Sequence, residues 1–169
     1  MIERINVTPG VTTRKATRAG LVTTNYGTIY ACTSQMPVYN AGGSSEVLIG
    51  GIAAEMKYLR DNGLAVSSTL PVINQCNVNA RIDGGENVKG GGIAGSAEGK
   101  LSNNTYEYGI TLLQDQNRFK NILYAKGTEN LDVYDNEWAT KAGNAVTNGS
   151  ELTNYRPEPE LYNQVLDSQ

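Results

Sequence analysis

The stretch of residues 20–33 reads Gly20-Leu-Val-Thr-Thr-Asn-Tyr-Gly-Thr-Ile-Tyr-Ala-Cys-Thr33. Two runs within it, 21–24 and 28–33, are rich in β-branched and aromatic residues, and they flank an Asn-Tyr-Gly turn. This pattern predicts a β-hairpin. Further short runs of the same kind lie at 38–39, 46–49, 70–73, 78–82, 106–112, 121–125 and 130–134. The chain is therefore expected to be mainly β.

Composition supports the same fold class. Gly, Asn and Thr supply 52 of the 169 residues, and all three are poor in helix interiors. Leu, Ile, Val and Phe supply only 36 residues, just above the level of about 20% below which chains tend to stay disordered. One short helix is predicted at 52–62, because Ile52, Met56 and Leu59 fall on one helical face.

Charge and proline divide the chain into three parts. We expect an extended arm at 1–19, a compact β-rich domain at 20–135 and a polar acidic tail at 136–169. The first 20 residues carry four basic side chains against one acid, whereas 129–169 carry a net charge of −6. Opposite charges at the two ends suggest contacts with neighbouring subunits. The phrases Gly51-Ile-Ala-Ala54 and Gly92-Ile-Ala-Gly95 are similar, but their flanks differ, so no repeat is predicted.

Few residues are suited to catalysis. The chain has no histidine, which excludes a Ser-His-Asp triad, HExxH zinc chemistry and a Cys-His dyad. Cys32 and Cys76 form no CxxC motif. Residues 90–95 match GxGxxG by letter, but no helix follows to receive a pyrophosphate. We therefore expect no enzyme and no cofactor.

An acidic turn near the end of the predicted domain is a candidate calcium site. Asp132, Asp135 and Glu137 place carboxylates close together in the sequence, and oxygen ligands of this kind bind calcium. The spacing matches no EF-hand loop, so a solvated turn is the alternative.

The sequence also bears on where the protein is made and on which partners it has. No run approaches the roughly 18 apolar residues of a spanning helix, and no apolar signal segment follows Met1. We expect synthesis in the cytoplasm and no contact with a membrane. A net charge of −3 argues against nucleic acid as the partner.

Several phrases resemble the head decoration (cement) proteins of tailed bacteriophages, of the lambda type. They are Ala19-Gly-Leu-Val22, Tyr26-Gly-Thr-Ile-Tyr-Ala31, Val47-Leu-Ile-Gly-Gly-Ile-Ala-Ala-Glu55, Pro71-Val-Ile73 and Val78-Asn-Ala80. The resemblance covers about a third of the chain, and residues 83–169 have no counterpart. It implies a non-enzymatic virion protein that binds an assembled capsid shell, often as a trimer, with the major capsid protein or other virion subunits as partners.

The expected binding residues lie in the arm and the tail. The resemblance implies that the arm pairs with the capsid lattice, and β-augmentation is a physical route for it. The arm residues are Ile5, Val7, Val11, Arg14, Lys15 and Arg18, and the residues expected to clasp another subunit are Tyr155, Glu158, Glu160 and Tyr162.

Three alternatives remain. The protein could be another virion component, from the tail or the neck. It could be a secreted adhesin or pilus subunit with a Cys32–Cys76 disulfide. It could also be an enzyme that works through Asp and Glu, although no specific motif supports this.

Overall fold

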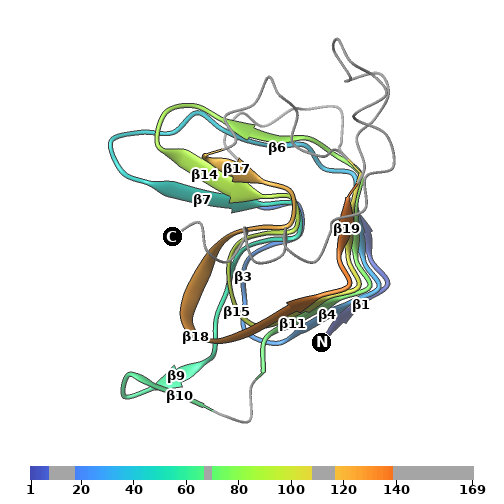
Figure 1. Ribbon diagram of the computed structural model, residues 1–169, viewed down its shortest axis with the longest axis vertical. Coiled ribbons are helices and arrows are strands. Elements are labelled where there is room, and N and C mark those ends of the chain that lie inside the picture. Colours follow the sequence, from blue (N-terminus) through green and yellow to red (C-terminus); the bar gives the residue numbers. More distant parts are fainter. Residues whose placement is uncertain (8–17, 67–69, 108–116, 139–169) are drawn as a thin grey trace.

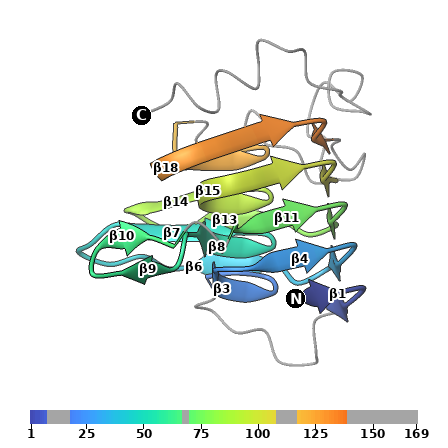
Figure 2. The same cartoon turned by 90° about the horizontal axis from the view of Figure 1, so that it is seen from below.

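The chain winds into a parallel β-solenoid. The computed structural model describes residues 1–7, 18–66, 70–107 and 117–138. All strand pairs between successive turns are parallel; the single antiparallel pair of the described residues, β9 with β10, is a hairpin within one turn. Figure 2 shows the turns stacked in sequence order, from β1 to β18. The prediction of a mainly β fold is confirmed.

In the described residues, five successive turns contribute strands at equivalent positions. The first holds β1 (Ile2–Glu3) and β2 (Asn6–Val7). The second holds β3 (Val22–Asn25), β4 (Thr28–Tyr30), β5 (Thr33–Ser34), β6 (Val38–Asn40) and β7 (Val47–Gly50). The third holds β8 (Ala53–Met56), β11 (Val72–Asn74), β12 (Asn77–Val78), β13 (Ile82–Gly84) and β14 (Val88–Gly91). The fourth holds β15 (Ala94–Ser102), β16 (Thr105–Tyr106) and β17 (Phe119–Lys120), and the fifth holds β18 (Leu123–Tyr134) and β19 (Glu137–Trp138).

One six-residue unit recurs in all five turns, and we call it the hexad. The hexads are 2–7, 29–34, 73–78, 101–106 and 133–138, and strand pairing aligns them residue by residue. The third residue of each hexad has a left-handed backbone, with φ between 52° and 55°. This residue turns the chain from one strand to the next, so the solenoid makes the same corner in every turn.

The core is a set of columns that run along the solenoid axis. The first hexad position stacks Ile29, Ile73 and Leu101, all fully buried. At the two ends of this column, Ile2 and Val133 are only partly buried. Stacking identical positions lets a chain with few large apolar residues bury a continuous core.

Two predictions for the second and third turns are wrong. Residues 21–33 do not form a hairpin, because β3 and β4 lie in the same turn and pair with different strands. Residues 52–62 do not form a helix: β8 lies between β3 and β15, and β9 (Arg60–Asp61) begins a hairpin with β10 (Leu64–Ala65). Pairing on both sides of β8 satisfies its backbone and overrides the helical spacing. The described residues contain no helix, and hence none that could cross a membrane.

The glycine-rich stretch up to Gly99 contains β14 and most of β15. Gly51 and Gly92 stand at equivalent corners, since Ala53 pairs with Ala94 two residues further on. A Cβ at Gly92 would collide with the ring of Tyr106, and one at Gly51 with Val78. The similar phrases at 51–54 and 92–95 therefore form the same corner in two successive turns. The sequence alone did not predict this repeat.

The N-terminal residues belong to the solenoid. Residues 2–7, expected in an extended arm, form β1 and β2 and pair with β4 and β5 of the next turn. The hairpin β9–β10 projects from the side of the third turn (Figure 1).

Candidate functional site

The two ends of the solenoid are the candidate sites, because strand pairing stops there in the described residues. The N-terminal edge is the hexad 2–7, in which, within the part of the chain that the structure describes, β1 pairs with β4 alone and β2 with β5 alone. The C-terminal edge is the hexad 133–138, whose strands, among the described residues, pair with the fourth turn. An unpaired strand edge is a template for another chain.

The structure describes three of the six predicted arm residues. Ile5 has 43% of its surface exposed, and its carbonyl accepts a hydrogen bond from the Thr33 N–H at 2.7 Å. Val7 lies in β2, opposite Ser34. Two of the predicted contact residues thus share the N-terminal edge.

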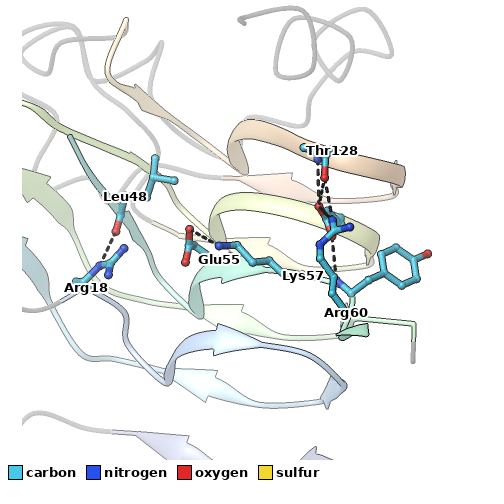
Figure 3. Close-up of polar contacts among 8 residues, drawn as sticks. Arg18, Leu48, Glu55, Lys57, Arg60 and Thr128 are labelled. Atoms are coloured by element: carbon cyan, nitrogen blue, oxygen red, sulfur yellow. Dashed lines mark hydrogen bonds and ion pairs between the residues drawn. The ribbon is translucent and has the colours of Figure 1, made fainter. Parts of the chain in front are cut away.

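Arg18 lies at another corner of the same end. Its carbonyl accepts a hydrogen bond from the Gly50 N–H at 3.0 Å. Its exposed guanidinium donates from Nε to the Leu48 carbonyl at 3.4 Å (Figure 3). Arg18 therefore adds positive charge beside β7 rather than within the N-terminal edge. Val11, Arg14 and Lys15 lie outside the described residues, as do all four predicted tail residues: Tyr155, Glu158, Glu160 and Tyr162.

A buried polar column, which the sequence did not predict, runs along the solenoid axis through one position of the hexads. Its members occupy the fourth hexad position and are Cys32, Cys76, Asn104 and Asn136, with Ile5 at the exposed end. The Asn104 side chain accepts from the Cys76 N–H at 2.9 Å and donates from Nδ2 to the Ile73 carbonyl at 3.0 Å. Asn136 Oδ1 accepts both the backbone N–H and the Nδ2 of Asn104. This column joins neighbouring turns where the chain bends.

The two thiols take the place of amides in this column. The Cys32 Sγ lies 3.3 Å from the Tyr30 carbonyl, and the Cys76 Sγ lies 3.4 Å from the Asn74 carbonyl. Both cysteines are free and buried. Burial is the main cause that raises the pKa of Cys76 to about 12, so this thiol is a poor nucleophile at neutral pH.

A buried carboxylate ties the projecting hairpin to the fourth and fifth turns. Glu98 accepts hydrogen bonds from the Tyr58 N–H at 2.9 Å and from the hydroxyl and N–H of Thr128 at 2.9 and 3.1 Å. It also forms an ion pair with Arg60 at 2.9 Å (Figure 3). Burial of Glu98 opposes its ionisation, but these hydrogen bonds and the Arg60 charge outweigh burial and lower its pKa. We call these four residues the Glu98 cluster.

The Glu98 cluster is a structural device rather than a reactive centre. The carboxylate is only 3% exposed, and its oxygens already accept bonds from three residues. Elsewhere in the described residues, no group of three or more His, Cys, Asp or Glu side chains is placed to hold a metal ion. Within the predicted acidic turn, Asp132 and Asp135 are exposed.

Comparison with known proteins identifies no relative. No family model matches the chain, and no curated protein or solved structure is similar to it. A function must therefore be inferred from the geometry of the solenoid and its two edges.

Proposed function

We propose that this chain is a non-enzymatic structural subunit of a bacteriophage virion. Its most specific form is a capsid decoration subunit that binds an assembled shell through the N-terminal edge of the solenoid. One observation supports this above all: β1 and β2 end the stack with one side unpaired in the described residues. An edge of this kind binds an extended segment by β-augmentation, which requires backbone groups rather than a pocket.

The composition of the edge supports the same proposal. Ile5 presents an exposed apolar side chain, and the side chain of Arg4 is 75% exposed. The Arg4 N–H donates to the Tyr30 carbonyl at 3.0 Å. Because successive amides of a strand point in opposite directions, the Glu3 N–H points away from β4 and toward the open side. Glu3 is thus the position at which backbone pairing with a shell protein begins.

Blocking this amide tests the proposal. Proline at position 3 removes the outward N–H without removing a bond inside the solenoid. Shells that lack this protein should co-sediment with the unaltered chain, and Glu3→Pro should abolish co-sedimentation. The control is Glu3→Ala, which keeps the N–H but removes the exposed Glu3–Arg4 ion pair, and it should bind almost normally. Normal binding by Glu3→Pro, or no binding by the unaltered chain, would exclude this docking mode.

The two cysteines provide a comparison with the secreted adhesin alternative. Cys32 and Cys76 occupy the same position in adjacent turns, where strands lie about 4.8 Å apart, within the range of Cα separations that a disulfide bridges. A secreted subunit should carry this bond, whereas a virion subunit assembled in the cytoplasm should keep both thiols. The mass of freshly made protein with and without reductant distinguishes the two.

A further inference from the structure

We propose that Cys32 and Cys76 form an oxidation site, at which a small peroxide joins the second and third turns of the solenoid by a disulfide once the first turn opens. The proposal goes beyond shell binding and does not depend on it, because it concerns the chain alone. A virion subunit made in the cytoplasm keeps both thiols at first. The bond forms only after the protein meets an oxidant.

The two thiols are neighbours in the buried polar column. Two residues before them, strand pairing aligns Tyr30 with Asn74. Just after them, the Asn77 N–H donates a hydrogen bond to the Cys32 carbonyl at 2.8 Å. The two cysteines are therefore separated by the spacing of neighbouring strands, about 4.8 Å. This spacing lies within the range of Cα separations that a disulfide bridges, about 4.4–6.8 Å.

Each sulfur reaches toward the preceding turn. Cys76 Sγ lies 3.9 Å from the Ile29 carbonyl of the second turn, and Cys32 Sγ lies 3.9 Å from the Ile2 carbonyl of the first turn. Burial is the main cause of the raised pKa of Cys76, and a hydrogen bond with the Cys32 side chain contributes to it. The two sulfurs are therefore close enough to be joined by side-chain rotation.

The first turn controls access to this pair. Cys32 is only 1% exposed, and among the described residues the hexad 2–7 is the turn that precedes it in the stack. The Thr33 N–H holds that hexad in place by donating to the Ile5 carbonyl at 2.7 Å. Terminal elements open more readily than central ones. Opening of the first turn therefore exposes Cys32, while the second turn still covers Cys76.

The reaction consumes one peroxide and both thiols. The Cys32 sulfur attacks one peroxide oxygen, the O–O bond breaks, and a sulfenic acid forms on Cys32 as one water leaves. The Cys76 sulfur then attacks the Cys32 sulfur. The S–S bond forms, the S–O bond breaks, and the hydroxyl leaves as a second water with the Cys76 proton. The two sulfurs are oxidised and the two peroxide oxygens are reduced. Proximity compensates for the weak nucleophilicity of Cys76.

Oxidation of the reduced full chain with hydrogen peroxide tests the site. Proteolytic fragments that contain Cys32 and Cys76 should be found joined, and the intact mass should fall by two hydrogens, apart from any oxygens gained by methionines. The bond closes a loop that includes the hairpin β9–β10 and so restricts the unfolded chain. The urea midpoint of unfolding should therefore rise by about 1–2 M and return when the bond is reduced.

A matched pair of variants tests control by the first turn. Ile2 and Val133 are the two partly buried ends of one apolar column. Ile2→Ala weakens the packing of the first turn, so the two thiols should be lost to peroxide about tenfold faster than in the unaltered chain. Val133→Ala removes the same kind of contact at the far end of the column and should leave the rate unchanged.

Amide hydrogen exchange separates opening of the first turn from general loss of stability. The Thr33 amide is bonded to the first turn, whereas the Thr105 amide donates to the Cys76 carbonyl at 2.8 Å in the third turn. In Ile2→Ala, exchange of Thr33 should accelerate by a factor similar to that of oxidation, and exchange of Thr105 should not. Disulfides between separate molecules, oxidation that stops at a sulfenic acid, equal oxidation rates in the two variants, or equal acceleration at Thr33 and Thr105 would overturn the proposal.

Discussion

At the scale of single residues, the solenoid depends on a few small and polar side chains at its corners. Asn104 illustrates this, because its buried amide contacts both the turn before it and the turn after it. Neighbouring turns use Cys76 and Cys32 at the same position, with a thiol near the carbonyl that an amide would otherwise reach. The identity of the residue changes along the column while its role persists, which hides the column from sequence reasoning.

Removing the Asn104 amide should lower the stability of the fold. Asn104→Ala leaves the Cys76 N–H and the Asn136 side-chain oxygen without their amide partner in a buried site. We expect the free energy of unfolding to fall by about 2–4 kcal/mol, measured by urea denaturation. The control is the adjacent exposed residue, Asn103→Gly, which suits the left-handed backbone there and should cost less than about 0.5 kcal/mol. Equal losses in the two variants would contradict this role for the column.

At the scale of elements, pairing between turns overrides local preference. Ile52 and Met56 have helical spacing, yet both are buried around β8, whereas Leu59, the third member of the predicted helical face, is 47% exposed. A spacing of four residues also places two side chains on one face of a strand, so the pattern was ambiguous. The strand runs were largely predictable from their β-branched residues. Their partners were not, because each pairs with a strand about 27 to 44 residues away.

The hairpin β9–β10 should depend on the Glu98 cluster. The lowered pKa of Glu98 means that its contribution to stability is present above the usual pKa of a glutamate and is lost as the pH falls through the lowered value. Glu98→Gln removes the charge, so we expect the free energy of unfolding to fall by about 1–2 kcal/mol at neutral pH. As the pH is lowered, the stability of this variant should decline less than that of the unaltered chain. Amide hydrogen exchange of residues 60–65 should be faster in this variant than in the unaltered chain.

The matched control for this prediction is Glu55→Gln. Its ion pair with Lys57 at 3.0 Å is more exposed (Figure 3), so it should cost less than about 0.5 kcal/mol and leave exchange in the hairpin unchanged. If Glu55→Gln and Glu98→Gln had the same effect, the Glu98 cluster would not be what holds the hairpin.

At the scale of the whole molecule, stacking leaves two ends of different character. The opposite charges of the two termini were visible in the sequence, as was the suggestion that they contact other subunits. The register was not visible, since the five hexads differ in sequence and the hairpin insertion lengthens the third turn. Of the predicted contact residues, Ile5 and Val7 lie on the N-terminal edge and Arg18 lies at a separate corner.

The solenoid depends on the in-register stacking of its turns, and methyl nuclear Overhauser effects measure this stacking. With labelled Ile, Leu and Val methyl groups, Ile29 should show a cross-peak to Ile73, Ile73 to Leu101 and Leu101 to Val133, as the pairing requires. Cross-peaks between Ile29 and Val22 without one to Ile73 would instead indicate the local hairpin. That result would contradict the solenoid and both of its proposed edges.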